Sequence, residues 1–354
     1  MVSLSSSLFI IKPFLCFILL FLATFPSYVL GAIEVQDLVI DSPLLTKNIP
    51  TNRTIKVDDE GEGEFKSIQA AIDSIPEGNS QWVIVHVRKG VYREKITIPK
   101  SKPYIFLRGN GRGKTAIVWS QSSIDNIESA TFKVEAHDVI IFGVSIKNEA
   151  PTGVAYTSQN QSVAAFVGAD KVAFYHCALY STHNTLFDYK GRHYYEECYI
   201  QGSIDFIFGR GRSLFHKCEI FVIDDKRTAI KGSITAQNRE SESEASGFVF
   251  VKGKVYGIGG THLGRAKGPY SRVIFAKVYL SATVVPEGWA HWSYAGSTEH
   301  LYHGEYKTFG PGANTTKRAS WSKQLTEKEA EPFMSVDYID GKEWLPAWLS
   351  TSSI

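Results

Sequence analysis

The sequence lacks an excess of charge of either sign, and beyond Gly31 it lacks a long apolar run. The whole chain of 354 residues includes 38 Lys and Arg and 36 Asp and Glu, a formal net charge of +2. A nucleic-acid-binding surface is therefore not indicated, because such a surface needs clustered positive charge. Nor do we expect stable membrane insertion, since no later segment is long and apolar enough to span a bilayer.

Cysteine is also scarce, and the cysteines beyond the N-terminal region are regularly spaced. Cys177, Cys198 and Cys218 follow one another at intervals of 21 and 20 residues, each with an aromatic residue three positions before it and an aliphatic residue two positions after it. Repeats of this length are typical of solenoids, in which each coil buries its apolar face against its neighbours. Because three cysteines cannot all pair, we interpret them as small core residues, with one disulfide between neighbouring coils as the alternative.

Short β-rich runs without intervening helices precede these cysteines and predict a parallel β-helix. Apolar residues at helical spacing between Glu64 and Ile75 predict a short helix that caps the first coil. The period is lost from Gly288 onward, where we expect the chain either to pack along the side of the solenoid or to close its far end, with a further helix over Leu325–Met334. The predicted strands before the first cysteine are Trp82–Val87, Lys95–Ile98, Tyr104–Leu107, Ile117–Trp119, Thr131–Val134 and Val139–Ile146.

The N-terminal region has a different character. Phe14–Leu30 is almost wholly apolar, follows Lys12 and ends at Gly31, so we predict a secretory signal peptide over residues 1–31, which contains Cys16. The alternative is an uncleaved membrane anchor.

After the signal peptide we expect an extended lead-in over residues 32–54 and one β-helix domain over residues 55–354. Secretion is compatible with three glycosylation sequons, which begin at Asn52, Asn160 and Asn314.

One acidic residue lies among apolar residues between the second and third cysteines. Asp205 precedes Phe206, Ile207 and Phe208, and a carboxylate in such surroundings costs free energy unless a cation pairs with it. Arg265 is the candidate partner, and it would hold Asp205 ionised.

Coil spacing predicts which residues accompany this acid. Asn184 lies 21 residues before Asp205, so both should occupy the same point on adjacent coils, about 4.8 Å apart. Gln161 lies 22 residues before His183 and should fall one coil further up, on the coil that precedes His183. The pattern therefore predicts a column of polar groups over an apolar floor, although Gln161 could instead belong to a stacked amide ladder.

The segment Gly202–Gly209, GSIDFIFG, resembles the signature of the plant pectinesterases, or pectin methylesterases. The resemblance covers about Ile55 to Trp344. It implies a secreted, single-stranded right-handed parallel β-helix that hydrolyses methyl esters of homogalacturonan without a metal or organic cofactor, and we expect the short form without an inhibitor-like domain. Other matching segments are GVYRE at 90–94, QSVAAF at 161–166, LGR at 263–265, YSR at 270–272, GEY at 304–306 and GPGAN at 310–314.

The resemblance also implies roles for three side chains. Asp205 would be the nucleophile that attacks the ester carbonyl, Arg265 would fix that nucleophile, and Gln161 would donate to the developing oxyanion. Each role is physically sensible, because ion pairing supports a weak carboxylate nucleophile and an amide can donate to developing negative charge.

Three positions depart from the family pattern. Where the family has Gln-Asp-Thr-Leu, His183 replaces an oxyanion-stabilising Gln and Asn184 replaces the proton-donating acid. An amide cannot act as a general acid, so His183 and Asp188 are the candidate substitutes. Lys267 stands where the family has a sugar-stacking Trp, and its charge would favour a partly de-esterified polymer in the substrate site.

Other functions remain open. The three departures motivate a pectin-binding homologue that has lost catalysis. A β-helix glycosidase or lyase would need a pair of carboxylates or a metal site, whereas the column shows one acid. We expect a monomer in the cell wall whose partner is methyl-esterified homogalacturonan. Three aromatic residues either pack on the solenoid or stack on sugars, namely Trp289, Trp292 and Tyr294.

Overall fold

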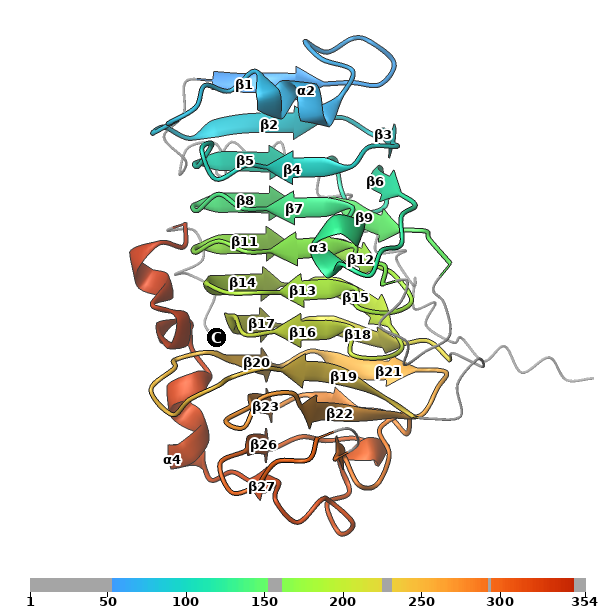
Figure 1. Cartoon of the computed structure of the whole chain (residues 1–354), viewed down its shortest axis with the longest axis vertical. Helices are drawn as coiled ribbons and strands as arrows, with labels where there is room; N and C mark the ends of the chain where they lie inside the picture. Colours follow the sequence, from blue (N-terminus) through green and yellow to red (C-terminus); the bar gives the residue numbers. More distant parts are fainter. Residues whose placement is uncertain (1–52, 152–160, 225–230, 292–293, 347–354) are drawn as a thin grey trace, which may run out of the picture. The chain divides into compact units, whose positions relative to one another are not determined.

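The computed structural model describes residues 53–151, 161–224, 231–291 and 294–346. Their strands form three parallel sheets stacked coil on coil (Figure 1). None of the helices in these ranges is long and apolar enough to cross a membrane. The predicted signal peptide, nearly all of the lead-in, Cys16, Trp292 and the sequon asparagines Asn52 and Asn160 lie outside the described residues.

The first sheet, sheet A, has eleven strands in the described part of the chain. In spatial order they are β1 (Arg53–Val57), β2 (Val83–Val87), β5 (Ile105–Arg108), β8 (Val139–Phe142), β11 (Val172–Tyr175), β14 (Arg192–Glu196), β17 (Arg212–His216), β20 (Gly247–Val251), β23 (Arg272–Ala276), β26 (Tyr302–Tyr306) and β27 (Lys323–Gln324).

The other two sheets have eight strands each within the same ranges. Sheet B comprises β3 (Gly90–Tyr92), β6 (Thr115–Trp119), β9 (Ser145–Asn148), β12 (Ala178–Tyr180), β15 (Tyr199–Gly202), β18 (Glu219–Val222), β21 (Lys254–Gly257) and β24 (Tyr279–Leu280). Sheet C comprises β4 (Ile96–Ile98), β7 (Phe132–Val134), β10 (Ala165–Val167), β13 (Leu186–Asp188), β16 (Ile207–Gly209), β19 (Gly232–Gln237), β22 (Thr261–Ala266) and β25 (Trp289–Ala290).

Successive strands visit sheets C, A and B in turn, so every strand pairs in parallel with the equivalent strand one coil away. The pairing of Phe174 with Tyr195 and of Tyr195 with Phe215 has the spacing of the cysteine repeat. The predicted parallel β-helix is therefore confirmed.

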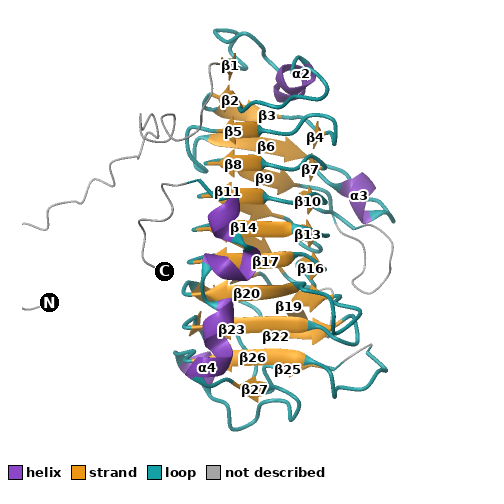
Figure 2. Cartoon of the chain, turned by 90° about the vertical axis from the view of Figure 1, so that its left-hand side faces the viewer, coloured by secondary structure: helices purple, strands orange, loops and turns teal. Residues whose placement is uncertain are grey.

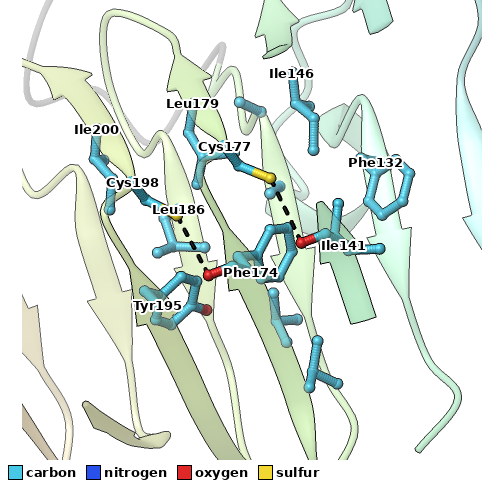
Figure 3. Packing of buried hydrophobic residues seen from close by; sticks show 14 of the residues in the cluster. Phe132, Ile141, Ile146, Phe174, Cys177, Leu179, Leu186, Tyr195, Cys198 and Ile200 are labelled. Atoms are coloured by element: carbon cyan, nitrogen blue, oxygen red, sulfur yellow. Dashed lines mark hydrogen bonds between the residues drawn. The ribbon is translucent and has the colours of Figure 1, made fainter. Parts of the chain in front are cut away.

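The cysteine repeat forms part of the interior. Cys177, Cys198 and Cys218 are buried and free, which confirms the core interpretation and rules out the alternative disulfide. The Cys177 and Cys198 thiols donate to the carbonyl oxygens of Ile141 and Phe174, one coil back, at 3.7 and 3.5 Å (Figure 3). Burial raises the pKa values of the Cys177 and Cys198 thiols well above the usual range of a cysteine, so both thiols stay protonated.

The aromatic residues three positions before the cysteines stack face to face. Phe174 and Tyr195 have ring centroids 5.3 Å apart, and Tyr195 and Phe215 have theirs 4.5 Å apart. The ladder continues to Phe250 and Phe275, with separations of 4.5 and 4.4 Å. These rings supply much of the apolar contact between coils.

Helices close the solenoid at its first coil and cover one flank. Helix α2 (Ile68–Asp73) lies within the predicted helix and packs Ile68, Ala71 and Ile72 into the main core, which confirms the cap (Figure 1). After β27, helix α4 (Glu327–Ala330) and the short 3-10 helices Glu331–Phe333, Val336–Ile339 and Gly341–Glu343 run beside sheet A (Figure 2).

Two sequence expectations about strands are wrong. The predicted strand Val139–Ile146 is two strands, β8 and β9, because Gly143 turns the chain between them at φ 62°. The repeat also does not stop at Gly288, since β25, β26 and β27 continue the sheets beyond it. Large loops separate these last strands and obscure their period in the sequence.

Candidate active site

An aromatic floor lies on sheet C, separate from the main core. Phe166, Phe187 and Phe208 occupy the same position on β10, β13 and β16. Phe187 stacks on Phe208 at 4.4 Å, and Phe166 meets Phe187 edge-on at 5.3 Å. The predicted apolar floor is therefore present, although Phe206 and Ile207 belong to the main core.

Asn184 and Asp205 lie at one corner of adjacent coils, just before the strands that carry Phe187 and Phe208. The β13–β16 register pairs Phe187 with Phe208, and its continuation toward the N-terminus places Asn184 opposite Asp205, as predicted. Both residues have left-handed backbones, with φ of 55° and 46°. Asn and Asp tolerate this conformation better than most residues, and it turns the chain just before each strand.

The signature that contains Asp205 ends at a glycine for a steric reason. Gly209 has φ 124°, and a Cβ atom there would lie 1.9 Å from the carbonyl oxygen of Asp188 on the neighbouring coil. No larger residue fits this close approach without moving the backbone.

The Asp205 carboxylate is held by an arginine and a serine. Arg265 Nε lies 2.9 Å from Oδ1, and Arg265 Nη2 lies 2.6 Å from Oδ2. The Ser233 hydroxyl donates to Oδ1 at 2.8 Å. The side chains of Arg265 and Asp205 are 12% and 15% exposed, so this charge-assisted pair is only partly screened by water. The contact between Arg265 and Asp205 is the one that the sequence predicts.

Asn184 is held by another amide. Its Nδ2 donates to Oδ1 of Asn126 at 3.1 Å, and Asn126 begins the short helix α3 (Asn126–Ser129). Helix α3 stands beside sheet C (Figure 2), and Ile127 packs against the aromatic floor. The chain thus has an amide pair at the position where the resemblance implies an acid.

Gln161 and His183 do not align as predicted. The β10–β13 register pairs Ala165 with Leu186, so its continuation places Ser162 opposite His183. Gln161 instead forms an antiparallel bridge with Ser123, and its backbone NH donates to the Ser123 carbonyl at 2.8 Å. His183 is 8% exposed and bridges Ile204 on the next coil.

Asp188 is not available to the site. Its carboxylate is fully buried and accepts hydrogen bonds from Tyr195 at 2.8 Å and Ser213 at 2.8 Å, and it lies 2.9 Å from Nδ1 of His193. Burial lowers the pKa of His193, but the Asp188 carboxylate and the Ala169 carbonyl outweigh it and raise this pKa above its usual value. The expectation that Asp188 could replace the missing acid is therefore wrong, because an interior network holds it.

Lys267 lies over the floor. Its Nζ is 5.6 Å from the centroid of the Phe208 ring, in cation–π range. The side chain as a whole is exposed, yet protein atoms crowd the ammonium group, and this desolvation lowers the pKa of Lys267. The Asp205 carboxylate opposes that shift and Arg265 adds to it, so Lys267 feels the charges of the site.

Two further aromatic candidates make packing or local contacts. Trp289 is 2% exposed and stacks on His303 at 4.6 Å, so it packs inside the solenoid. Tyr294 is half-buried and donates to the carbonyl of Ser297 at 3.2 Å. Within the described residues, no group of three or more His, Cys, Asp or Glu side chains is arranged to hold a metal ion.

Comparison with known proteins identifies the family. The pectinesterase family model matches residues 54–342. The chain belongs to the pectinesterase family. Probable pectinesterase 67 of Arabidopsis thaliana is 66% identical over 318 residues, covering 90% of this chain and 92% of that protein.

Solved pectinesterases share the fold. The pectin methylesterase from carrot superposes with a TM-score of 0.77 at 29% identity, covering 83% of this chain and 94% of that one, so the fold is a right-handed parallel β-helix. A pectin methylesterase solved in complex with a hexasaccharide superposes with a TM-score of 0.70 at 20% identity, covering 84% of this chain and 99% of that one.

For this pectinesterase, sequence reasoning missed two contacts of the site. The β16–β19 register pairs Ile207 with Thr235 and so places Ser233 opposite Asp205, across a coil that is longer than the cysteine repeat. Asn126 comes from helix α3, which lies outside the repeat. The β19–β22 register places His262 next to Ser233, one coil further along. Its Nδ1 donates to the Gly232 carbonyl at 3.2 Å, and burial is the main cause that lowers the pKa of His262.

Proposed function

We propose that this chain is a secreted pectin methylesterase that hydrolyses the methyl esters of homogalacturonan to free carboxylates and methanol during cell-wall modification. The observation that carries the proposal is the Asp205 carboxylate, held by Arg265 and Ser233 beside the aromatic floor. A weak nucleophile becomes effective when it is fixed in position at a partly desolvated site. Family membership and the hexasaccharide bound by a related fold support pectin as the substrate.

The proposed reaction has two steps. Asp205 attacks the ester carbonyl carbon, the Gln161 amide donates to the oxyanion, and the bond to the methoxy oxygen breaks as the His183 imidazolium gives it a proton. Methanol leaves, and the substrate acyl group is joined to Asp205 as an anhydride. Neutral His183 then accepts a proton from the water that attacks the acyl carbon, and the bond to the Asp205 oxygen breaks, which restores Asp205 and His183. The product acid loses its remaining proton to solvent and leaves as the carboxylate.

His183 takes the acid's role in this proposal for two reasons. Asn184 cannot donate a proton as a general acid, and Asp188 is enclosed by Tyr195, Ser213 and His193. His183 adjoins Asn184, and the left-handed backbone of Asn184 interrupts the strand alternation that would otherwise point the two side chains opposite ways. The proposal further places Lys267 as a binding group for free carboxylates of the polymer.

A second candidate is a pectin-binding homologue without turnover. The observation that favours it is the hydrogen bond between Asn184 and Asn126. Because of this bond, a neutral amide pair occupies the position where the resemblance implies an acid. Both candidates place the chain in the cell wall as a monomer. Both are compatible with a glycan on Asn314, which is exposed.

The deciding experiment is methanol release from highly esterified pectin by the purified protein, from about pH 5 to about pH 9. The enzyme proposal expects release that Asp205→Ala abolishes while leaving the circular dichroism spectrum unchanged. Pectin binding without release in the natural chain, together with release by Asn184→Asp, would establish the binding homologue instead.

A further inference from the structure

A hollow of about 390 Å³ lies outside the Asp205 site. It is formed where the segments that follow β19 and β22 meet the N-terminal ends of β23, β26 and β27. The side chains that matter for its chemistry are Arg239, Tyr270, Arg272, His300, Tyr302 and Lys323. We call this hollow the arginine pocket.

Arg239 is a buried cation whose hydrogen bonds, within the described residues, go to no carboxylate. It is 4% exposed, and its guanidinium donates to backbone carbonyls, those of Glu244 at 2.7 Å, Tyr270 at 3.2 Å and Glu242. Burial lowers the pKa of Arg239 and the neighbouring Arg272 adds to the effect, while the charges of Glu244 and Glu242 only partly oppose it. A buried guanidinium that donates to no carboxylate is costly, so a bound anion would stabilise it.

Arg272 adds a second guanidinium, and one of its hydrogen-bond donors has no partner in the described residues. Its Nε is buried and has no hydrogen-bond partner in the described residues, and its Nη1 makes a long contact of 3.4 Å to the Ser246 carbonyl. Neither Arg239 nor Arg272 forms an ion pair with any carboxylate of the described chain. The planar guanidinium group can donate two parallel hydrogen bonds to the oxygens of a carboxylate.

The rest of the lining suits a sugar. Tyr270 stacks on His300 at 4.7 Å with an interplanar angle of 10°, and Lys323 Nζ lies 5.4 Å from the centroid of the Tyr302 ring. Half-buried tyrosines offer an apolar face for a sugar ring together with a hydroxyl that can hydrogen-bond it. Glu242 and Glu299 also line the pocket, but both are exposed and can accept hydrogen bonds from sugar hydroxyls.

We propose that the arginine pocket binds a free uronate residue in a de-esterified stretch of pectin. Tyr270 lies three residues after Lys267 on the segment that leaves the catalytic strand β22, so the pocket is next to the site that would produce such residues. The inference rests on the proposed function for the identity of the ligand. Its consequence is retention of the product chain, which would favour successive reactions on one polymer.

Calorimetry with the full chain tests this inference. In an Asp205→Ala, Lys267→Met background, which also removes the lysine proposed to attract free carboxylates beside Phe208, we expect trigalacturonate to bind at least about tenfold more tightly than its methyl ester, because only the acid gains charge-assisted hydrogen bonds. Lys323→Ala combined with Arg272→Leu should remove that preference. Arg272→Lys alone should only reduce it, because a lysine keeps the positive charge but cannot donate two parallel hydrogen bonds to one carboxylate. Lys328→Ala, a lysine of α4 outside the pocket, should leave it intact.

Several outcomes would overturn the inference. These are equal affinity for acid and ester, a preference that survives the double substitution, or competition by inorganic phosphate as strong as that by trigalacturonate. Failure of the two proposals can be told apart by methanol release. If the natural chain releases no methanol but the pocket variants still lose uronate binding, only the enzyme proposal fails. If the natural chain releases methanol but the pocket variants bind uronate as tightly as the natural pocket does, only the pocket proposal fails.

Discussion

Arg265 contacts both carboxylate oxygens of Asp205 from a strand two coils further along, with Nε 2.9 Å from Oδ1 and Nη2 2.6 Å from Oδ2. A planar guanidinium fixes the orientation of a carboxylate in a way that a lysine ammonium cannot. Arg265→Lys should therefore slow methanol release about 10²-fold by misplacing the nucleophile. Arg210→Lys is the matched control, since Arg210 pairs with Glu244 away from Asp205 and its substitution should leave the rate unchanged. An Arg265→Lys enzyme of natural activity would contradict a positioning role.

Asn184→Asp should raise methanol release about 10²-fold, because it restores a carboxyl group that can protonate the departing methanol. Asn126 can rotate its amide to donate to the new group, so the hydrogen bond is kept. Asn184→Ala is the control for simple loss of the amide and should not raise the rate. Initial rates on esterified pectin measure the effect, and a slower Asn184→Asp enzyme would count against this position as the acid site.

His183→Gln tests the proton donor through the pH profile. If His183 acts as the imidazolium acid, the natural enzyme should lose activity as pH rises through the titration of that imidazole, because the donor is then neutral. In the His183→Gln enzyme this alkaline limb should disappear and the maximal rate should fall about 10²-fold. An unchanged profile would exclude His183 from proton transfer.

Lys267→Met should change which pectin is preferred. The ammonium over Phe208 attracts free carboxylates, so its loss should lower kcat/KM for partly de-esterified pectin more than for fully esterified pectin. Desolvation lowers the pKa of Lys267, so the natural preference should fade as pH rises through that lowered value, below the range of an ordinary lysine. Lys254→Met, which removes a lysine over Tyr256 on sheet B, is the control. Equal losses on both pectins would refute a selective role.

Asp188→Asn should destabilise the fold by about 3–5 kcal/mol, because it leaves buried His193 without its charge partner. The pKa of His193 is raised in the folded state, so its ionic contribution is complete at about pH 5 and is lost as pH rises through the folded-state value. Urea unfolding at about pH 5 and about pH 9 should show the larger difference between natural and variant chains at the lower pH. Glu197→Gln, at the exposed pair with His176, should cost at most about 1 kcal/mol.

The fold was largely predictable because each coil repeats the same physical requirement. An aromatic residue, a small thiol and an aliphatic residue recur where the chain must fill the interior, and their spacing fixes the pairing of Phe174, Tyr195 and Phe215. Prediction weakened where loops enlarge the coils, as after Gly288, since a variable spacing hides which strands pair.

The site was predictable only along the regular coils. Asn184 and Asp205 align because no insertion separates their strands. Ser233 was missed because the next coil is longer, and Asn126 was missed because the short helix α3, which carries it, lies outside the repeat. Asp188 was misjudged because strand alternation gives the face of a residue but not the partners that enclose it.

Asp205, Ser233 and Arg265 come from three successive coils, and their hydrogen bonds span 28 and 60 residues of chain. Each coil touches mainly its neighbours, so a solenoid can open at one interface while the rest stays folded. Separation of the coils at β16, β19 or β22 would dismantle the nucleophile's support without melting the capped end. Heat inactivation should therefore precede loss of most β-structure, and the temperature interval between the two would measure the local stability of these three coils.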